Sequence, residues 1–271
     1  MIIKDQDTKT FTVNEKFNSE TKPKSTNDGN IIIVGQTNSP GISNGNDDIW
    51  ISKIDSDGNE IWFKGYGQKN HEVGYDIVEM DNGNFIIVGY RDFYVESGKD
   101  ILIMSIDKEG NKLWEKIIAS NGIYDDIAYS ISKSKNYGFI ISASTNSTGH
   151  DWYDPQVINI DFSGNVIWNH TYNGSGLKHT RWVSTATNDG GAAIAGTTNY
   201  FRESGSNEDA YLMKIDQDGN KLWDLSIPGG KNDWGWDIIE TINSKLVITG
   251  ATKSYGAGLY DILIAKIDNP E

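Results

Sequence analysis

The sequence of 271 residues contains no cysteine and only three arginines. The absence of cysteine excludes disulfide bonds and thiolate metal sites, and it is compatible with a protein exported from the cell. Acidic residues outnumber basic residues by 38 to 24, which gives a formal net charge of −14. Such a surface repels the phosphates of nucleic acids and of anionic lipids, so we expect neither as a partner.

Long apolar segments are also missing. No run of 18 apolar residues occurs, so the sequence predicts no membrane insertion, and residues 1–17 lack the apolar centre of a signal peptide. No stretch has the 3.6-residue periodicity of an amphipathic helix. What the chain does have is many β-branched and aromatic residues, together with 29 glycines for its turns. This composition favours an all-β protein.

One sequence unit occurs five times. Four copies read DIWISKIDSDGNEIW, DILIMSIDKEGNKLW, DPQVINIDFSGNVIW and DAYLMKIDQDGNKLW, and a shortened fifth copy reads DILIAKID. The second aspartate of each copy recurs at spacings of 52, 54, 55 and 52 residues, at Asp55, Asp107, Asp161, Asp216 and Asp268. A period of about 50 residues predicts a repeat architecture such as an array or a propeller.

Each unit contains four short segments with a strand pattern, joined by glycine-containing hairpin turns such as the IDxxGN turn. Four strands joined in this way and repeated radially describe a propeller blade. We therefore predict one all-β domain over residues 1–271, a five-bladed β-propeller with four-stranded antiparallel blades. The predicted blades span residues 19–66, 73–119, 127–172, 180–227, and 234–268 together with 10–17.

The two ends of the chain predict how the ring closes. The last repeat stops after its third strand, and the segment Lys9–Phe17 resembles the fourth-strand segment Lys112–Ile118. We expect the N-terminal segment to add the missing outer strand of the last blade. Such closure would leave the ring without the open ends of a linear array.

The order of these segments and the ID..GN..W signature resemble the repeats of secreted bacterial and archaeal surface β-propellers. The signature is also similar to the tryptophan repeat of quinoprotein-type propellers, and the resemblance spans Phe11 to Asp268. It implies that the repeat tryptophans wedge between adjacent blades, and these are Trp62, Trp114, Trp168 and Trp223. No residue matches the quinone and calcium sites of the larger quinoprotein rings, so we expect no cofactor and no metal. An extracellular or cell-surface location is the expectation.

A column of aromatic and polar residues marks the start of the first strand of four repeats. The aromatic members are Tyr75, Tyr129, Trp182 and Trp236. Three residues before them come Glu72, Asp126, His179 and Asp233, and one residue after them come Asp76, Ser130, Val183 and Asp237. If this strand lines the channel, these groups surround its mouth, and the variable loops between the second and third strands, which include Trp152, open on the same face. The alternative is that the ring aromatics only fill the channel.

All three arginines fall in or beside these segments, at Arg91, Arg181 and Arg202. The planar guanidinium suits a carboxylate or a phosphate, so their placement points to an anionic or hydroxyl-rich ligand. The alternative is that each arginine forms an ion pair with a neighbouring acidic residue.

We expect a monomeric, non-catalytic module that recognises a glycan or a protein through the long-loop face and the channel mouth. One alternative is a glycoside hydrolase acting on a polysaccharide, which would need two mouth carboxylates about 5–10 Å apart. The mouth carboxylates occupy equivalent positions in several repeats, however, which favours structural roles for them. No serine or cysteine nucleophile motif occurs, and the histidines have no metal-ligand spacing. The other alternative is a structural module of a larger surface protein.

Overall fold

The computed structural model describes residues 22–38, 47–93, 98–119, 123–136, 138–148, 153–172, 181–198 and 208–268. Within these ranges all regular secondary structure is β-strand. No helix with the length and apolar character to cross a membrane occurs in these ranges.

The strands form five antiparallel sheets. The first sheet contains β1 (Lys22–Ser25), β2 (Ile31–Thr37), β3 (Asp48–Ile54) and β4 (Glu60–Tyr66). The second contains β5 (His71–Glu79), β6 (Phe85–Asp92), β7 (Lys99–Ile106) and β8 (Lys112–Ile118). The third contains β9 (Asp126–Lys133), β10 (Phe139–Thr145), β11 (Asp154–Ile160) and β12 (Val166–Thr171). The fourth contains β13 (Val183–Ala186), β14 (Ala192–Thr198), β15 (Asp209–Ile215) and β16 (Lys221–Ile227). The fifth contains β17 (Asp233–Glu240), β18 (Leu246–Thr252) and β19 (Asp261–Ile267).

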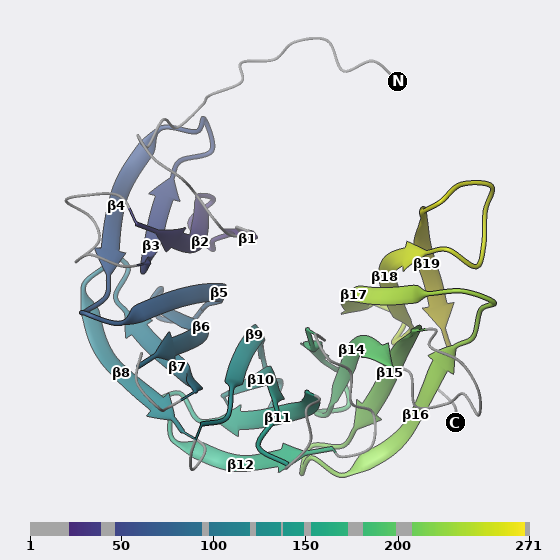
Figure 1. The fold of residues 1–271 in the computed structure, drawn as a ribbon. Helices are drawn as coiled ribbons and strands as arrows, with labels where there is room; N and C mark the ends of the chain where they lie inside the picture. Colours follow the sequence, from purple (N-terminus) through teal and green to yellow (C-terminus); the bar gives the residue numbers. More distant parts are fainter. Residues whose placement is uncertain are drawn as a thin grey trace.

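The five sheets stand side by side around a common centre (Figure 1). The first strand of each sheet lies nearest the centre, and the fourth strands β4, β8, β12 and β16 form the outer rim (Figure 1). The predicted all-β fold of five repeated antiparallel units is therefore confirmed. The described strands trace an open arc with the first and fifth sheets at its ends, and the predicted closing strand at residues 10–17 lies outside the described residues.

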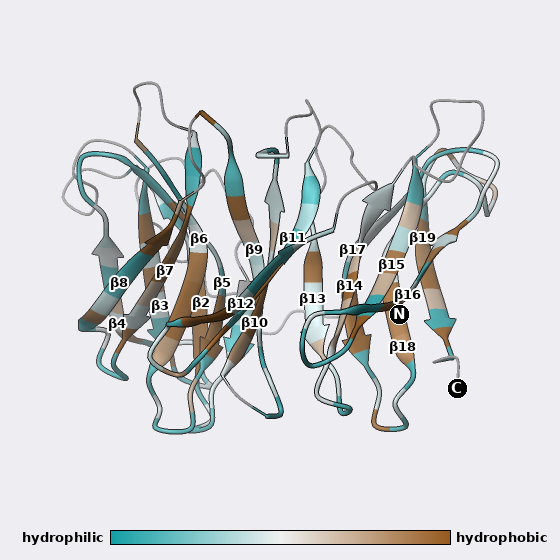
Figure 2. Cartoon of the chain, turned by 90° about the horizontal axis from the view of Figure 1, so that it is seen from below, coloured by the Kyte–Doolittle hydropathy of each residue, from teal (hydrophilic) through white to brown (hydrophobic). Residues whose placement is uncertain are grey.

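The core consists of apolar layers between successive sheets. Ile49 and Ile51 on β3 pack in one cluster with Ile77, Phe85 and Ile87 of the second sheet. The same arrangement recurs at the next three junctions of the arc. Figure 2 shows the apolar character concentrated along the strands and the hydrophilic residues at the turns. The nearly continuous β-branched runs of the sequence are explained by this burial, because the second and third strands of the inner sheets are covered on both faces.

Three of the repeat tryptophans contact a turn of the following sheet, as the resemblance implied. Trp62 on β4 donates from Nε1 to the carbonyl of Lys108, 3.2 Å away in the turn of the second sheet. Its ring also lies over Gly110 of that turn, whose φ of 78° only glycine adopts readily. Trp114 lies over Gly164 and Trp168 over Gly219 in the same way. The first three sheets are thus each held to the next sheet at the outer rim.

Candidate binding site

The innermost strands of three sheets are irregular at the aromatic residues that the sequence singled out. The pairing of β5 with β6 shifts between Gly74 and Asp76, which leaves Tyr75 as the extra residue of a β-bulge. Tyr129 on β9 and Trp236 on β17 occupy the corresponding bulges. A bulge bends the strand and turns a side chain away from the regular alternation, so these aromatics leave the layers between the sheets.

The glycine at one register of β6 and of β18 is explained by this bulge. A Cβ placed on Gly89 would lie 1.7 Å from the carbonyl oxygen of Val73, and one on Gly250 would lie 1.7 Å from that of Trp234. The backbone that approaches them belongs to the bulged strand of the same sheet.

Two of the bulge tyrosines and one arginine form a compact cluster. The ring centroids of Tyr75 and Tyr129 are 4.9 Å apart, and the Arg181 guanidinium carbon lies 5.4 Å from each. These distances are within the range of cation–π attraction. Tyr90 on β6 extends the cluster, with its ring 6.0 Å from Tyr75. The group, which we call the Tyr–Arg cluster, thus draws on the second sheet, the third sheet and the segment before β13.

The electrostatics of the Tyr–Arg cluster follow from partial burial. Loss of water raises the pKa of both Tyr75 and Tyr129, so both hydroxyls are neutral at physiological pH. The same loss of water lowers the pKa of Arg181, although a guanidinium stays protonated at any physiological pH. The Arg181 side chain is nevertheless exposed at the surface. The cluster therefore presents a positive charge on an aromatic base at the surface of an acidic protein.

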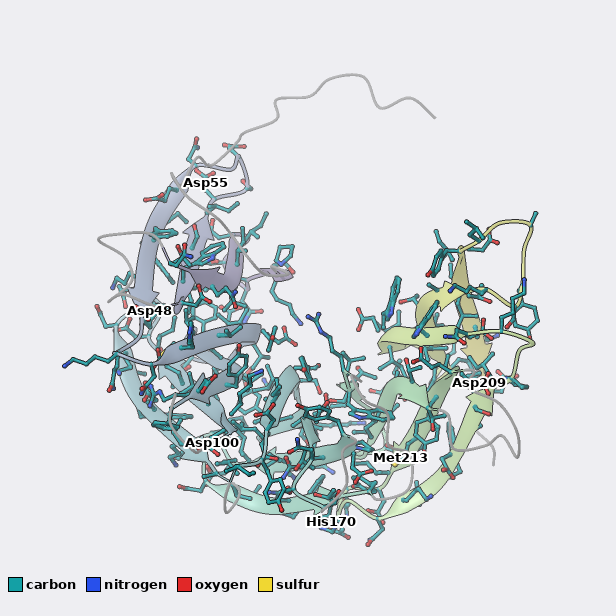
Figure 3. All side chains as sticks on the ribbon, in the orientation of Figure 1. Asp48, Asp55, Asp100, His170, Asp209 and Met213 are labelled. Carbon is teal, nitrogen blue, oxygen red and sulfur yellow. The ribbon has the colours of Figure 1, made fainter. Side chains whose placement is uncertain are left out.

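A cavity of about 430 Å³ lies among the innermost strands. It is lined by Lys24, Asp76, Ser130, Ser132 and Asp237, among other residues of all five sheets. Sticks along the innermost strands point into the space inside the arc (Figure 3). The lining is rich in hydroxyl and carboxylate groups, which are suited to a polar ligand.

Asp76 is the most strongly engaged group of this lining. Only 2% of it is exposed. Its carboxylate accepts hydrogen bonds from the backbone N–H groups of Ile77, at 2.9 Å, and Ile131, at 3.1 Å. Lys24 lies 3.3 Å from the same carboxylate. Asp76 therefore ties the second sheet to the first and third, and its repeat counterpart Asp237 is exposed on β17.

The earlier acidic position of the column is structural in the sheets where it is described. Glu72 is 1% exposed and accepts a 2.8 Å hydrogen bond from Nε of Arg91, which also contacts Glu115 at 2.6 Å. Asp233 is fully buried and accepts a 2.6 Å hydrogen bond from the hydroxyl of Ser254. Glu72 and Arg91 are therefore paired with each other inside the protein, and Asp233 is held by Ser254.

Asp126, at the same position of the column as Glu72, is also buried, with 3% exposed. The aromatic members of the column lie in different surroundings. Trp182 has no exposed surface and packs edge-on against Tyr211, so it is a core residue and lies outside any surface ring. Trp236 is 62% exposed on β17. Trp152, His179 and Arg202 lie outside the described residues.

Several side chains on this face were not expected from the sequence to belong to the site. The other second strands have a small or polar residue at the position of Tyr90. This difference was the feature of the sequence that could have indicated its role. On the fifth sheet, the rings of Trp234 and Tyr260 stack at 5.7 Å, and the Lys253 ammonium lies 4.5 Å from the Tyr260 ring. Trp234 stands at the repeat position that the buried Val73 occupies in the second sheet. This difference could have indicated its role from the sequence. Nowhere in the described part of the chain do three acidic or histidine side chains gather as metal ligands.

Comparison with known proteins locates the fold. No protein-family model and no curated protein matches the sequence. An endo-arabinase of Bacteroides thetaiotaomicron superposes with a TM-score of 0.53 at 10% identity, covering 97% of this chain and 99% of that one. The Pan2 WD40 domain of Neurospora crassa has the same TM-score and identity, covering 89% of this chain and 60% of that one. The fold is that of a β-propeller.

A third structure, NanB with Optactamide, superposes with a TM-score of 0.51 at 10% identity. It covers 82% of this chain, and this chain spans only 36% of that one. The predicted propeller repeat is thus confirmed, whereas none of these matches supports the similarity to quinoprotein-type propellers. At such identities the likeness concerns the fold alone.

Proposed function

We propose that this propeller is a recognition module that binds a carboxylate-bearing glycan at the Tyr–Arg cluster without catalysing a reaction on it. The observation that carries the proposal is the position of Arg181 over two tyrosine rings, 5.4 Å from each. Aromatic faces stack on the apolar faces of sugar rings, and a guanidinium binds a carboxylate through two parallel N–H donors. The cluster combines both elements in one place.

The cavity among the innermost strands supports a hydroxyl-rich ligand. Ser130, Ser132 and Asp237 are among the residues that line it, and hydroxyl and carboxylate groups form the hydrogen bonds that sugar hydroxyls require. One of the propellers with the same fold is an endo-arabinase by name, which supports a carbohydrate as the ligand class. A ligand of this kind fits the extracellular or cell-surface location expected from the sequence.

The engagement of the mouth carboxylates supports recognition over hydrolysis. A glycosidase needs one carboxylic acid and one carboxylate free to act on the scissile bond. Glu72 is held by Arg91, Asp233 by Ser254, and Asp76 by Lys24 and two backbone N–H groups. These bonds stabilise the loops and the sheets, and they keep the three carboxylates from acting as a catalytic pair.

The test is a binding measurement with polygalacturonate and with its methyl-esterified form, in which the carboxylates are neutral. We expect wild-type protein to prefer the charged polymer. Arg181→Ala should weaken that binding about 10- to 100-fold, because a charge-assisted contact contributes about 1.5–3 kcal/mol. Tyr129→Ala should weaken binding of both polymers.

The control is Lys108→Ala, which removes an exposed cation from a turn at the outer rim. It should leave binding unchanged. Equal binding by Arg181→Ala and wild type, or no difference between the two polymers, would contradict the proposed site.

A further inference from the structure

The outer strand of the third sheet differs from the other outer strands in charge. β12 reads VIWNHT and contains no acidic residue, lysine or arginine. The other three outer strands each carry charged side chains, namely Glu60 and Lys64 on β4, Lys112, Glu115 and Lys116 on β8, and Lys221 and Asp224 on β16. Charged side chains, lysine above all, protect an edge strand from pairing with another chain. β12 lacks this protection.

The β11–β12 hairpin also exposes two large apolar side chains that have no apolar counterpart in the other repeats. Phe162 is 47% exposed in the turn, and Val166 is 46% exposed at the start of β12. The equivalent residues are polar or charged, namely Ser56, Lys108 and Gln217 for Phe162, and Glu60, Lys112 and Lys221 for Val166. Ile167, 50% exposed, extends this surface at a position where every outer strand has an apolar residue. The uncharged strand thus carries an apolar surface that the repeat pattern alone does not explain.

The outward edge of β12 has no strand beside it in the described part of the chain. The sheet order ends with β11 and β12, and Figure 1 shows β12 on the outside of the arc. The edge of a strand presents unpaired N–H and C=O groups, and an antiparallel strand of the same sequence presents the matching groups. Such an edge is complementary to itself across a two-fold axis. All four outer strands share this geometry, so the missing charge distinguishes β12.

We propose that two copies of this chain associate through β12, so that their third sheets join into one antiparallel sheet about a two-fold axis. The self-complementary edge argues for a second copy as the partner. Pairing would bring Val166 and Ile167 of each copy into the contact, which removes apolar surface from water. The protein would then be a dimer, where the sequence alone led us to expect a monomer.

The distribution of charge explains why the contact forms at this strand. Two copies with a net charge of −14 repel each other overall. Residues 161–172 contain one charged residue, Asp161, whereas the equivalent residues 55–66 contain Asp55, Asp57, Glu60 and Lys64. The hairpin of the third sheet is therefore the part of the outer rim that two copies approach with the least desolvation of charge.

Sedimentation velocity over about a hundredfold range of concentration tests for the dimer. Wild-type protein should shift from monomer to dimer as the concentration rises. The shift should be larger at about 0.5 M than at about 0.1 M NaCl, because salt screens the repulsion between two acidic chains. Val166→Lys should weaken the association at least about tenfold, because it places like charges at the contact. This variant should fold normally, since Lys112 and Lys221 occupy the same position of the repeat.

The matched control is Ser56→Lys, which adds the same charge to the turn of the first sheet. Lys108 occupies the equivalent position of the second repeat, so the turn accepts a lysine. Ser56→Lys should leave the dimer intact. Both variants make the protein less acidic, so overall repulsion does not explain a loss of the dimer in only one of them.

Hydrogen exchange identifies the pairing strand and requires no variant. The backbone N–H groups of β12 should exchange more slowly at a concentration that gives the dimer than at one that gives the monomer, because pairing protects them. Those of β4, β8 and β16 should exchange equally at both concentrations. A monomer at every concentration, a dimer that Val166→Lys leaves intact, or protection of another outer strand in place of β12 would overturn the proposal.

Discussion

Arg91 offers the sharpest quantitative test, because the sequence analysis proposed it as a ligand contact and the structure places it in a buried ion network. Its side chain is 7% exposed and lies between Glu72, at 2.8 Å, and Glu115, at 2.6 Å. Replacing it by methionine keeps the apolar stem and removes the charge. The carboxylate of Glu72, 1% exposed, would then remain buried without its cation.

The expected magnitude follows from this geometry. Breaking a buried ion pair from one side costs about 3–5 kcal/mol, because the remaining charge is desolvated and uncompensated. Glu115 is less affected, since Lys112 lies 3.3 Å from it and the side chain is 19% exposed. We therefore expect Arg91→Met to lower the free energy of unfolding at pH 7 by about 3–5 kcal/mol.

The pH dependence of that loss gives an internal check. Burial raises the pKa of Glu72 even with Arg91 beside it, and removing Arg91 removes the group that opposes the rise. A group whose pKa is higher in the folded state is stabilising at low pH and loses that stabilisation as the pH rises through the folded value. Lowering the pH from 7 to 5 should therefore restore up to about 2.7 kcal/mol to Arg91→Met, since each pH unit corresponds to about 1.36 kcal/mol.

The assay is urea unfolding followed by circular dichroism at both pH values, with the double variant Glu72→Gln/Arg91→Met as control. The double variant removes both charges and should recover most of the loss at pH 7. A loss below about 1 kcal/mol for Arg91→Met, or an equal loss at both pH values, would refute a buried, structural network.

Two further predictions concern the turns and the bulges. Gly89→Ala should lower the free energy of unfolding by at least about 2 kcal/mol, because its Cβ would meet the Val73 carbonyl at 1.7 Å. Gly230→Ala, where nothing lies within 4 Å, should be nearly neutral in the same urea titration, and equal effects would contradict the bulge geometry. Backbone N–H donors, foremost those of Asn111 and Asn165, lower the pKa of Asp107 and of Asp161 below 3.8 in the exposed IDxxGN turns. The Tm of the wild type should therefore fall as the pH drops below about 4. The Tm of the double variant Asp107→Asn/Asp161→Asn should fall less. An equal fall in Tm for wild type and double variant between pH 4 and 2 would contradict this linkage.

The repeat made the fold predictable from the sequence. The five copies of the ID-containing unit and the IDxxGN turns determine the number of sheets, the strand order and the contacts of Trp62, Trp114 and Trp168 with the next turn. These features depend on local patterns, namely hairpin glycines and β-branched runs, which can be recognised in a sequence.

The site was less predictable, because its contacts join side chains from different sheets. Tyr75, Tyr129 and Arg181 do come together, in agreement with the column read from the sequence. Trp182 shares the column but is buried, because it packs against Gly196 of its own sheet. Whether an aromatic residue leaves or enters the core depends on the backbone path at the strand start, which spacing alone does not specify.

The tryptophan contacts at the rim all run in one direction along the chain. The ring of Trp62 packs against a turn of the second sheet. In the same way, Trp114 packs against a turn of the third sheet and Trp168 against a turn of the fourth. The emission of each indole therefore senses the integrity of the sheet that follows it more directly than that of its own sheet. Loss of one sheet from the ring would therefore change the fluorescence of a tryptophan in the preceding sheet.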